Sequence, residues 1–493
     1  MKQSIVLVTP PSRLEVYQQL SGELAAIEPP VWSGLIARFL LNKNIPTYIV
    51  DSESEKLNHE QTAKKIDSYN PCLVVFVIYG QQPSASTQCM PGGRKSCNEF
   101  KKISDIPTIV MGTHASALPA RTLNEEPYDY VCQGEGPYTV YELYQYLNGQ
   151  LDLKNVSGLW YKNKGLISNN AVKDKIENLD SELPNQALEL LNMSNYRAHN
   201  WHCFDDLSTR NSYASLQTSL GCPYKCSFCC INAPFGGSGI RYWTAENVLS
   251  QIDLMVDKYD IRNIKIPDEM FVLNKNHVLE ICDGIIDRGY KLNIWAYARV
   301  DTVKDYYLEK LKKAGFNWLG IGIESGSKFV RDGVEKGRFD IPDIKKIVDK
   351  IRSHGIYVAA NYIFGLPDDT KESMQQTLDL ALELNTEWAN FYSAMAYPGS
   401  PLYQEALDNK LFTPDQKGGP GWIGYSQHSF DCTPLPTDTL DYKEVLDFRD
   451  NAFKIYFNDK SYLSMIENKF GPDVVNHIQG MTSHDLPRAH HKN

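Results

Sequence analysis

The chain has 493 residues and a net charge of −10 at pH 7, and its length predicts about three domains. An acidic balance argues against a general nucleic-acid binder, which would show a basic face. Apolar residues make up 42% of the sequence, enough for real cores, and no apolar run approaches the roughly 18 residues of a membrane span. The odd count of 11 cysteines, with no recognisable signal peptide, predicts reduced thiols and a cytoplasmic protein.

Five short apolar runs alternate with helical patterns in the first part of the chain. The runs cover residues 5–9, 47–51, 73–79, 108–112 and 128–132, and helical spacing occupies 31–41 and 137–147. Continuous apolar strands between helices are typical of a parallel sheet that is covered on both faces. Residues 1–150 are therefore predicted to form a doubly wound, Rossmann-like domain.

Small and polar residues follow four of these runs. The positions are Thr9 and Pro10, Ser84, Gly112 and His114, and Gly134, Glu135 and Gly136. In open parallel sheets, ligands bind beyond the carboxyl ends of the strands. Simple turns explain one or two such positions, whereas four turns at the same predicted edge favour a ligand there.

A second series of strands and helices starts near residue 215. Residues 151–210 have the composition of a connector, with a hairpin near 158–167. Strand candidates then cover 215–220, 263–267, 292–298, 318–324, 357–364 and 389–396, with helical patterns between them. Six β/α units predict a partial (β/α)6 barrel of the TIM type over 211–430, whose active site lies at the carboxyl ends of the strands. A small helical extension is expected over 431–493.

Three cysteines share one short loop after the first barrel strand. Cys222, Cys226 and Cys229 form a C-x3-C-x2-C pattern, and Cys230 follows directly. A four-iron cluster normally takes four thiolates, so three thiolates leave one iron open to a substrate. A structural zinc site needs four closed ligands, usually two C-x2-C pairs, and only one such pair is present. The spacing therefore favours a 4Fe–4S cluster without Cys230.

This loop, with the aromatic Phe228 before its last cysteine, resembles the signature of the radical S-adenosylmethionine (SAM) enzymes. Over nearly its whole length the chain resembles the cobalamin-binding members of that family, in which a cobalamin-binding domain precedes the barrel. The segment Gly322-Ile-Glu-Ser-Gly326 is similar to the family's ribose-contacting strand. The resemblance implies three cofactors: a 4Fe–4S cluster, SAM and cobalamin.

The resemblance also implies roles for single residues around SAM. It places Phe228 near the adenine, Glu324 and Ser325 at the ribose hydroxyls, and Arg299 opposite the SAM carboxylate. Each lone charge has a structural ion pair as its alternative explanation.

Two positions depart from the family pattern. Asp268 and Glu269 follow the second strand where many members carry Gly-Gly-Glu, so either carboxylate is a candidate for the methionine ammonium. The Asp-x-His-x-x-Gly motif, whose histidine binds cobalt from below in many cobalamin proteins, is missing from the sequence. Cobalamin is therefore expected at the four strand-end turns without a histidine ligand, and His114 is expected to face the cofactor or solvent.

The activity implied is that of a methyltransferase acting on an unactivated centre of a small-molecule substrate. An electron donor such as flavodoxin or ferredoxin would serve it, and neither a nucleic acid nor a membrane is an expected partner. Radical oxidation or cyclisation without methyl transfer is the alternative within the same architecture. A methylthiotransferase fits less well, because the cysteines near the amino terminus do not form a convincing second set. A cobalamin or redox sensor without enzymatic activity is the alternative from another class.

Overall fold

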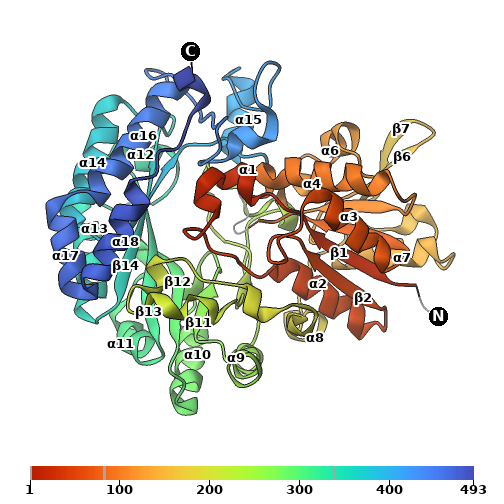
Figure 1. The fold of residues 1–493 in the computed structure, drawn as a ribbon, viewed down its shortest axis with the longest axis horizontal. Coiled ribbons are helices and arrows are strands. Elements are labelled where there is room, and N and C mark those ends of the chain that lie inside the picture. Colours follow the sequence, from red (N-terminus) through yellow and green to blue (C-terminus); the bar gives the residue numbers. More distant parts are fainter. Residues whose placement is uncertain (1–2, 81–84, 338, 493) are drawn as a thin grey trace.

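The computed structural model describes residues 3–80, 85–337 and 339–492. Two α/β units lie side by side, one in the red and orange part of the chain and one in the green to blue part (Figure 1). The yellow connecting segment passes between them. This arrangement confirms the predicted α/β class, with a doubly wound sheet before a partial barrel.

The amino-terminal unit is built on a sheet whose first five strands are parallel, in the order β2-β1-β3-β4-β5. The strands are β1 Ile5–Thr9, β2 Thr47–Asp51, β3 Leu73–Val77, β4 Thr108–Met111 and β5 Tyr130–Cys132. The helices are α1 Arg13–Tyr17, α2 Val31–Asn42, α3 His59–Ser68, α4 Ala85–Lys101, α5 Thr113–Ala117, α6 Pro119–Glu125 and α7 Pro137–Leu147. Every residue of β3 is buried, as expected for a strand covered on both faces.

The predicted hairpin extends this sheet instead of standing apart in the connector. β6 (Leu159–Asn163) pairs antiparallel with β5, and β7 (Leu166–Asn169) pairs antiparallel with β6. Lys164 and Gly165 at the turn both have positive φ, which is the backbone of a tight two-residue hairpin turn. The short helix α8 (Leu179–Glu182) follows.

The second unit is an open barrel of six parallel strands, in the order β8-β11-β12-β13-β14-β15. The strands are β8 Tyr213–Ser215, β11 Asn263–Ile266, β12 Asn293–Arg299, β13 Phe316–Glu324, β14 Tyr357–Phe364 and β15 Trp388–Ser393. The helices between them are α9 Ala245–Tyr259, α10 Lys275–Arg288, α11 Asp305–Lys313, α12 Lys328–Gly333, α13 Ile341–Ser353 and α14 Lys371–Leu384. Because all five pairings between these strands are parallel, all six carboxyl ends meet at one rim.

The first predicted barrel strand is split in the structure. After β8, the chain leaves the sheet, and β9 (Ser219–Leu220) pairs antiparallel with β10 (Arg241–Tyr242). The carboxylate of Asp268, beyond β11, accepts hydrogen bonds from Thr218 N (2.8 Å) and Ser219 Oγ (2.6 Å). These bonds hold the start of β9 beside the end of β11, so the cysteine loop between β9 and β10 stands over the rim of the barrel.

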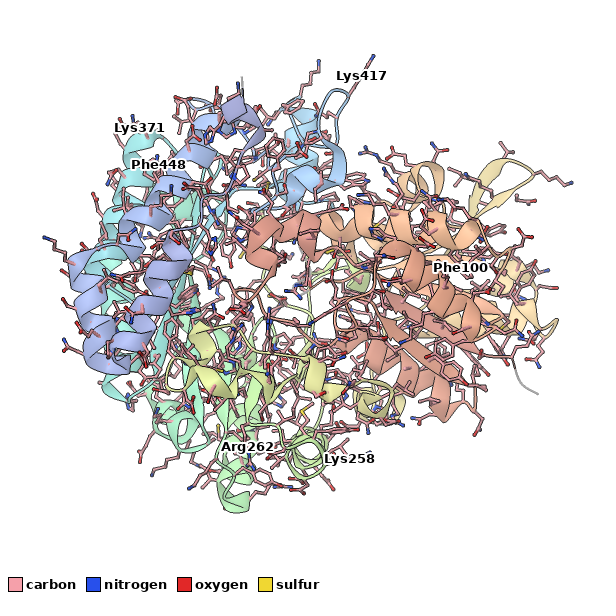
Figure 2. The ribbon with its side chains drawn as sticks, viewed as in Figure 1. Phe100, Lys258, Arg262, Lys371, Lys417 and Phe448 are labelled. Atoms are coloured by element: carbon pink, nitrogen blue, oxygen red, sulfur yellow. The ribbon has the colours of Figure 1, made fainter. Side chains whose placement is uncertain are left out.

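Helices α15 (Pro401–Asp408), α16 (Tyr442–Phe457), α17 (Lys460–Phe470) and α18 (Pro472–Thr482) complete the chain. α16 packs on the barrel, where the ring of Phe448 is 5.1 Å from that of Phe364. Figure 2 labels Phe448 on this helix. α18 lies within the helical extension expected over 431–493, and it starts with Pro472 directly after Gly471, a favourable first residue of a helix. No helix among the described residues is long and apolar enough to cross a membrane.

Candidate active site

A cavity of about 1230 Å³ lies between the two units. Its lining comes from the ends of β1 and β3 on one side and from the rim and interior of the barrel on the other. Exposed residues near the carboxyl end of the chain, including Asp485 and His491, line it where it meets solvent. Concave, mostly apolar spaces between domains are the usual places for cofactors and small ligands.

All the cysteines of the predicted cluster loop line this cavity: Cys222, Cys226 and Cys229, together with Cys230. The loop is fixed at its base, because the side chain of Asn232 donates to Cys222 O (3.2 Å) and Gly239 N donates to the same carbonyl (3.0 Å). The three thiols predicted to ligate the cluster therefore open into one cavity.

Three of these thiols, those of Cys222, Cys229 and Cys230, are held in an environment that disfavours thiolates when no cation is present. Burial raises the pKa of Cys222 to about 11 and that of Cys230 to about 12. Burial, with the carboxylate of Glu269 nearby, raises the pKa of Cys229 well above its usual value. Bound iron would supply the positive charge that stabilises these thiolates.

The spacing of the sulfur atoms suits a cluster better than a single ion. Tetrahedral zinc holds sulfurs at about 2.3 Å, hence about 3.8 Å from one another. Within the described part of the chain, no three cysteine sulfurs of this loop lie within 4.8 Å of one another. The loop therefore does not form a ready-made single-ion site, and its three thiolates are one fewer than the four that a four-iron cluster normally takes.

Arg299, at the end of β12, lies against the cluster loop. Its Nη1 is 3.5 Å from Cys226 Sγ, and its guanidinium stacks on the ring of Tyr224, with Cζ 3.9 Å from the centroid. Two further bonds go to the Asp301 carboxylate (3.0 and 2.9 Å), and Nη2 also donates to Lys336 O. The guanidinium is thus already well supplied with protein partners.

The two acidic residues after β11 have different surroundings. Asp268 is buried, does not line the cavity, and accepts hydrogen bonds from Thr218 and Ser219. Glu269 lines the cavity. Burial, with Asp268 adding repulsion, raises the pKa of Glu269 to about 7. Of the two candidates for an ammonium group, only Glu269 is presented to the cavity.

Glu324 ends β13 in an unusual backbone conformation, with φ of 66°. Its carboxylate lines the cavity and forms an ion pair of 2.5 Å with Lys336 Nζ. Lys336 is itself buried, and its Nζ lies 6.0 Å from the ring of Phe228, which also lines the cavity. Ser325 does not: its hydroxyl pairs with Thr377 Oγ1 (3.2 Å) and accepts from Ser327 N.

On the amino-terminal side, Thr9, Pro10, Tyr79 and Gly80 line the cavity at the ends of β1 and β3. Two buried polar atoms there, Tyr79 OH and Asp51 Oδ1, have no hydrogen-bond partner among the described residues. Such atoms normally find a partner, so this edge offers hydrogen-bonding groups to a bound molecule. A cobalamin, with its amide-bearing rim, fits an edge of this kind. Ser84 lies outside the described residues.

Two of the four predicted turns do not reach the cavity. Gly112 has φ of 143°, and a β-carbon there would collide with the carbonyl oxygen of Ile78. His114 is 1% exposed, lies edge-on to Trp422 and shares a hydrogen bond with Thr87 (3.2 Å). His114 therefore does not face solvent, because α5 turns its ring into a packed interior, and it is not part of the cavity lining.

The last turn joins the two units. Glu135 forms an ion pair with Arg241 of β10 and accepts from Ile176 N (2.8 Å). Gly134 and Gly136 both have positive φ, and a β-carbon at Gly136 would collide with Met111. These small residues therefore allow close packing at the domain junction rather than contact with the cavity.

Sequence reasoning missed several cavity residues. Lys336 follows α12, in a Glu-Lys-Gly turn shortly after the Glu-Ser-Gly segment. It belongs to no recognised motif, so nothing in its sequence context was a reason to select it. Glu28 and Lys265 form a buried pair (2.8 Å) between the amino-terminal unit and β11. A lysine inside an apolar strand was the available signal, since such a residue is almost never fully buried unless paired.

Comparisons with known proteins agree with this geometry. Residues 216–381 match the family model of the Radical SAM superfamily, and residues 19–144 match the B12 binding domain. An uncharacterized methyltransferase of Pyrococcus horikoshii is 29% identical over 409 residues, covering 83% of this chain and 84% of that protein. An anaerobic magnesium-protoporphyrin IX monomethyl ester cyclase of Rubrivivax gelatinosus is 24% identical over 462 residues, covering 91% and 77%.

Two solved structures share the fold. The cobalamin-dependent S-adenosylmethionine radical enzyme OxsB superposes with a TM-score of 0.71 at 16% identity, covering 98% of this chain and 71% of that one. The methyltransferase TsrM from Kitasatospora setae gives 0.67 at 15% identity, covering 94% and 90%. The radical SAM domain implies a 4Fe–4S cluster and SAM as cofactors, and the B12 binding domain implies cobalamin. The chain therefore belongs to the cobalamin-binding radical SAM enzymes.

Proposed function

We propose that this enzyme is a methyltransferase that methylates an unactivated centre of a small-molecule substrate. The observation that carries the proposal is the shared cavity, into which both the cysteine loop and the ends of β1 and β3 open. When bound, the cluster and SAM supply radical chemistry, and cobalamin supplies a methyl group. A substrate in this cavity would be within reach of both. The relative from Pyrococcus horikoshii, named a methyltransferase, supports the same reaction class.

The residues around the cluster loop suggest how SAM is held. Glu269 is the group that we assign to the methionine ammonium, since Asp268 is turned away from the cavity. Glu324 is suited to the ribose hydroxyls, which a carboxylate can accept from. For the SAM carboxylate we favour Lys336 over Arg299, because the Arg299 guanidinium is already paired with Asp301. To bind the SAM carboxylate, Lys336 would have to give up only its ion pair with Glu324.

The barrel interior is suited to excluding water from a reactive substrate. Trp295, Tyr297, Trp388 and Tyr392 line the cavity on this side. Aromatic side chains bury large areas with few rotatable bonds, so they form a rigid apolar wall. Closed apolar surroundings protect reactive intermediates from side reactions with solvent.

The cluster loop also offers a place for an electron donor. Lys225, between two of the cluster cysteines, is exposed, as is Pro223. The outer side of the loop thus reaches the surface while its thiols line the cavity. A small redox protein such as flavodoxin or ferredoxin, with an acidic patch, would be attracted to the lysine there.

Cyclisation without methyl transfer is the second candidate. The cyclase of Rubrivivax gelatinosus aligns with 91% of this chain, so the same arrangement of units occurs in a protein named for ring closure. The distinction lies in whether the methyl group of SAM reaches the product.

The experiment is to incubate the anaerobically reconstituted enzyme with a reductant, cobalamin, a pool of candidate small molecules and SAM that carries a deuterated methyl group. Methyl transfer predicts a product heavier than its substrate by one labelled methyl group, and S-adenosylhomocysteine as a by-product. Cleavage of SAM to deoxyadenosine with an unlabelled product would favour oxidation or cyclisation. Intact SAM under all conditions would contradict an enzyme and leave a sensor.

A further inference from the structure

Three side chains of types that commonly bind metal ions meet between α16 and the carboxyl-terminal segment. Asp447 lies on α16, and His490 and His491 lie on the 3-10 helix Ala489–Lys492. The Nε2 atoms of both imidazoles are 2.8 Å from Asp447 Oδ1. All three ligand atoms lie within 4.8 Å of one another. Two rings thus converge on one oxygen atom.

The backbone that carries the two histidines is firmly held. Arg488 is 1% exposed, and its guanidinium donates to both oxygens of Asp450 (2.8 and 2.9 Å). It also donates to the carbonyl oxygens of Ser429 (2.8 Å) and Gln427 (3.1 Å). This buried arginine lies two residues before His490 and holds the backbone that carries both imidazoles. The three ligand atoms thus lie close together without an ion.

We propose that Asp447, His490 and His491 form a binding site for a divalent transition-metal ion, with Zn²⁺ as its best fit. Imidazole nitrogen and carboxylate oxygen are ordinary zinc ligands at about 2.0–2.2 Å. Tetrahedral geometry at these lengths needs ligand atoms about 3.4 Å apart, so each Nε2 would move about half an ångström away from Asp447 Oδ1 to admit the ion. Three protein ligands leave a fourth position for water or for a group of a bound molecule.

The site lies where the cavity opens to solvent. Asp447 and His491 belong to the cavity lining, as do Arg449 and Asp450 one turn of α16 or less away. An ion there joins the carboxyl-terminal segment to α16. The same segment touches the amino-terminal unit, since the side chain of Gln19 donates to Asp485 O (2.7 Å). A bound ion would therefore fasten this segment across the cavity opening.

The inference does not rest on the proposed methyl transfer. It needs only the ligand set and its fixed backbone, and it has a readout that does not depend on activity. His484 provides a matched control: it is an exposed histidine of the same segment that lines the cavity but lies outside the ligand set.

The test is to measure the metal content of the chain with its iron–sulfur cluster in place. The cluster occupies the cysteine thiols, which would otherwise bind zinc themselves. After removal of loosely bound ions, the protein is dialysed against micromolar Zn²⁺ and analysed for zinc. The wild-type chain and His484→Ala should retain one equivalent more than the double variant His490→Ala/His491→Ala. Asp447→Asn should lower zinc affinity by more than tenfold, since losing a ligand costs more than the roughly 10–100-fold of an outer-shell partner.

A second readout follows the segment itself. Zinc should slow amide hydrogen exchange over residues 484–492 in the wild-type chain and have no effect in the double variant. Equal zinc content in the wild-type chain and the double variant would overturn the proposal. So would zinc binding that responds to His484→Ala but not to changes in the three ligands.

Discussion

The two sides of the cavity are prepared for their ligands in different ways. On the barrel side, two charged groups near the cluster loop are already paired: Glu324 with Lys336, and Arg299 with Asp301. On the amino-terminal side, Asp51 Oδ1 and Tyr79 OH are buried without a partner among the described residues. A ligand on the barrel side has to exchange existing ion pairs, whereas one on the other side completes bonds that are missing.

This difference fits the sizes of the two molecules concerned. SAM is small and charged, so a few paired side chains can fix its ammonium and carboxylate with charge-assisted bonds. A corrin is large and mostly uncharged, so shape, exposed backbone and a few unpartnered polar atoms serve it better. On the barrel side, we expect replacement of a single charged residue to have a large effect on ligand binding. On the amino-terminal side, we expect cobalamin binding to depend on no single residue.

The largest expected effect is loss of the cluster. Replacing Cys222, Cys226 or Cys229 by Ala removes one of the three thiolates, and two thiolates do not hold a four-iron cluster stably. The visible absorbance and the bound iron and sulfide should both be lost. Cys230 follows Cys229 and lines the same cavity, so the variant Cys230→Ala is the control and should keep the cluster. Wild-type iron content in the triple Ala variant would contradict the assignment.

Retention of cobalamin is the matching test of the amino-terminal side. The protein should keep hydroxocobalamin through gel filtration, and its Co(II) resonance spectrum should show no nitrogen coupling from a protein histidine. His114→Ala should change neither result, because His114 packs against Trp422 away from the cavity. Failure to retain any cobalamin would leave an enzyme that works without it. A histidine coupling that disappears in His114→Ala would require a different position for α5.

The same contrast explains what the sequence predicts well. Parallel strands with continuous apolar runs were located to within about two residues at most ends, since burial on both faces allows few polar residues. The three cysteines were recognisable because they are close in sequence and their spacing is set by the single cluster that they are predicted to bind. Asp268 and Glu269 were seen as a pair, but only contacts show that one turns inward and the other toward the cavity.

What escaped prediction depends on contacts between distant segments. Lys336 meets Glu324 only after the chain has passed through α12. Gly112 and Gly136 looked like ligand-binding turns, yet each is small because a neighbouring atom occupies the space of its missing β-carbon. A turn that binds and a turn that packs use the same residue types, so composition alone does not separate them.

Asp268 gives a smaller effect that depends on pH. Burial raises its pKa to about 6, so the folded state holds this proton more tightly than the unfolded chain does. The resulting stability is present below about pH 4 and is lost as the pH rises to about 6. Asp268→Asn removes this titration, and the variant should gain up to about 3 kcal/mol on the wild type between pH 4 and pH 7.

Chemical denaturation at the two pH values measures that difference. Asp257→Asn, on the exposed side of α9, should follow the wild type at both. An Asp268→Asn variant whose stability runs parallel to the wild type would show that the Asp268 carboxylate stays ionised in the fold, held by the hydroxyls of Thr218 and Ser219.

The smallest expected effect separates two roles for the ion pair at the end of β13. Glu324→Gln keeps the shape of the side chain but removes its charge, so SAM affinity of the cluster-loaded protein should fall by about 1–2 kcal/mol, roughly 5- to 30-fold. Lys336→Met keeps the aliphatic stem and removes the ammonium. If Lys336 binds the SAM carboxylate, this change also weakens SAM binding, and the double variant binds SAM more weakly than Glu324→Gln alone, although the two losses do not simply add for residues in contact. If Lys336 only holds Glu324 in place, Lys336→Met costs nothing once Glu324 is already Gln. Calorimetric titration of SAM into the four proteins distinguishes these outcomes, and an unchanged affinity in Glu324→Gln would remove the carboxylate from the SAM site altogether.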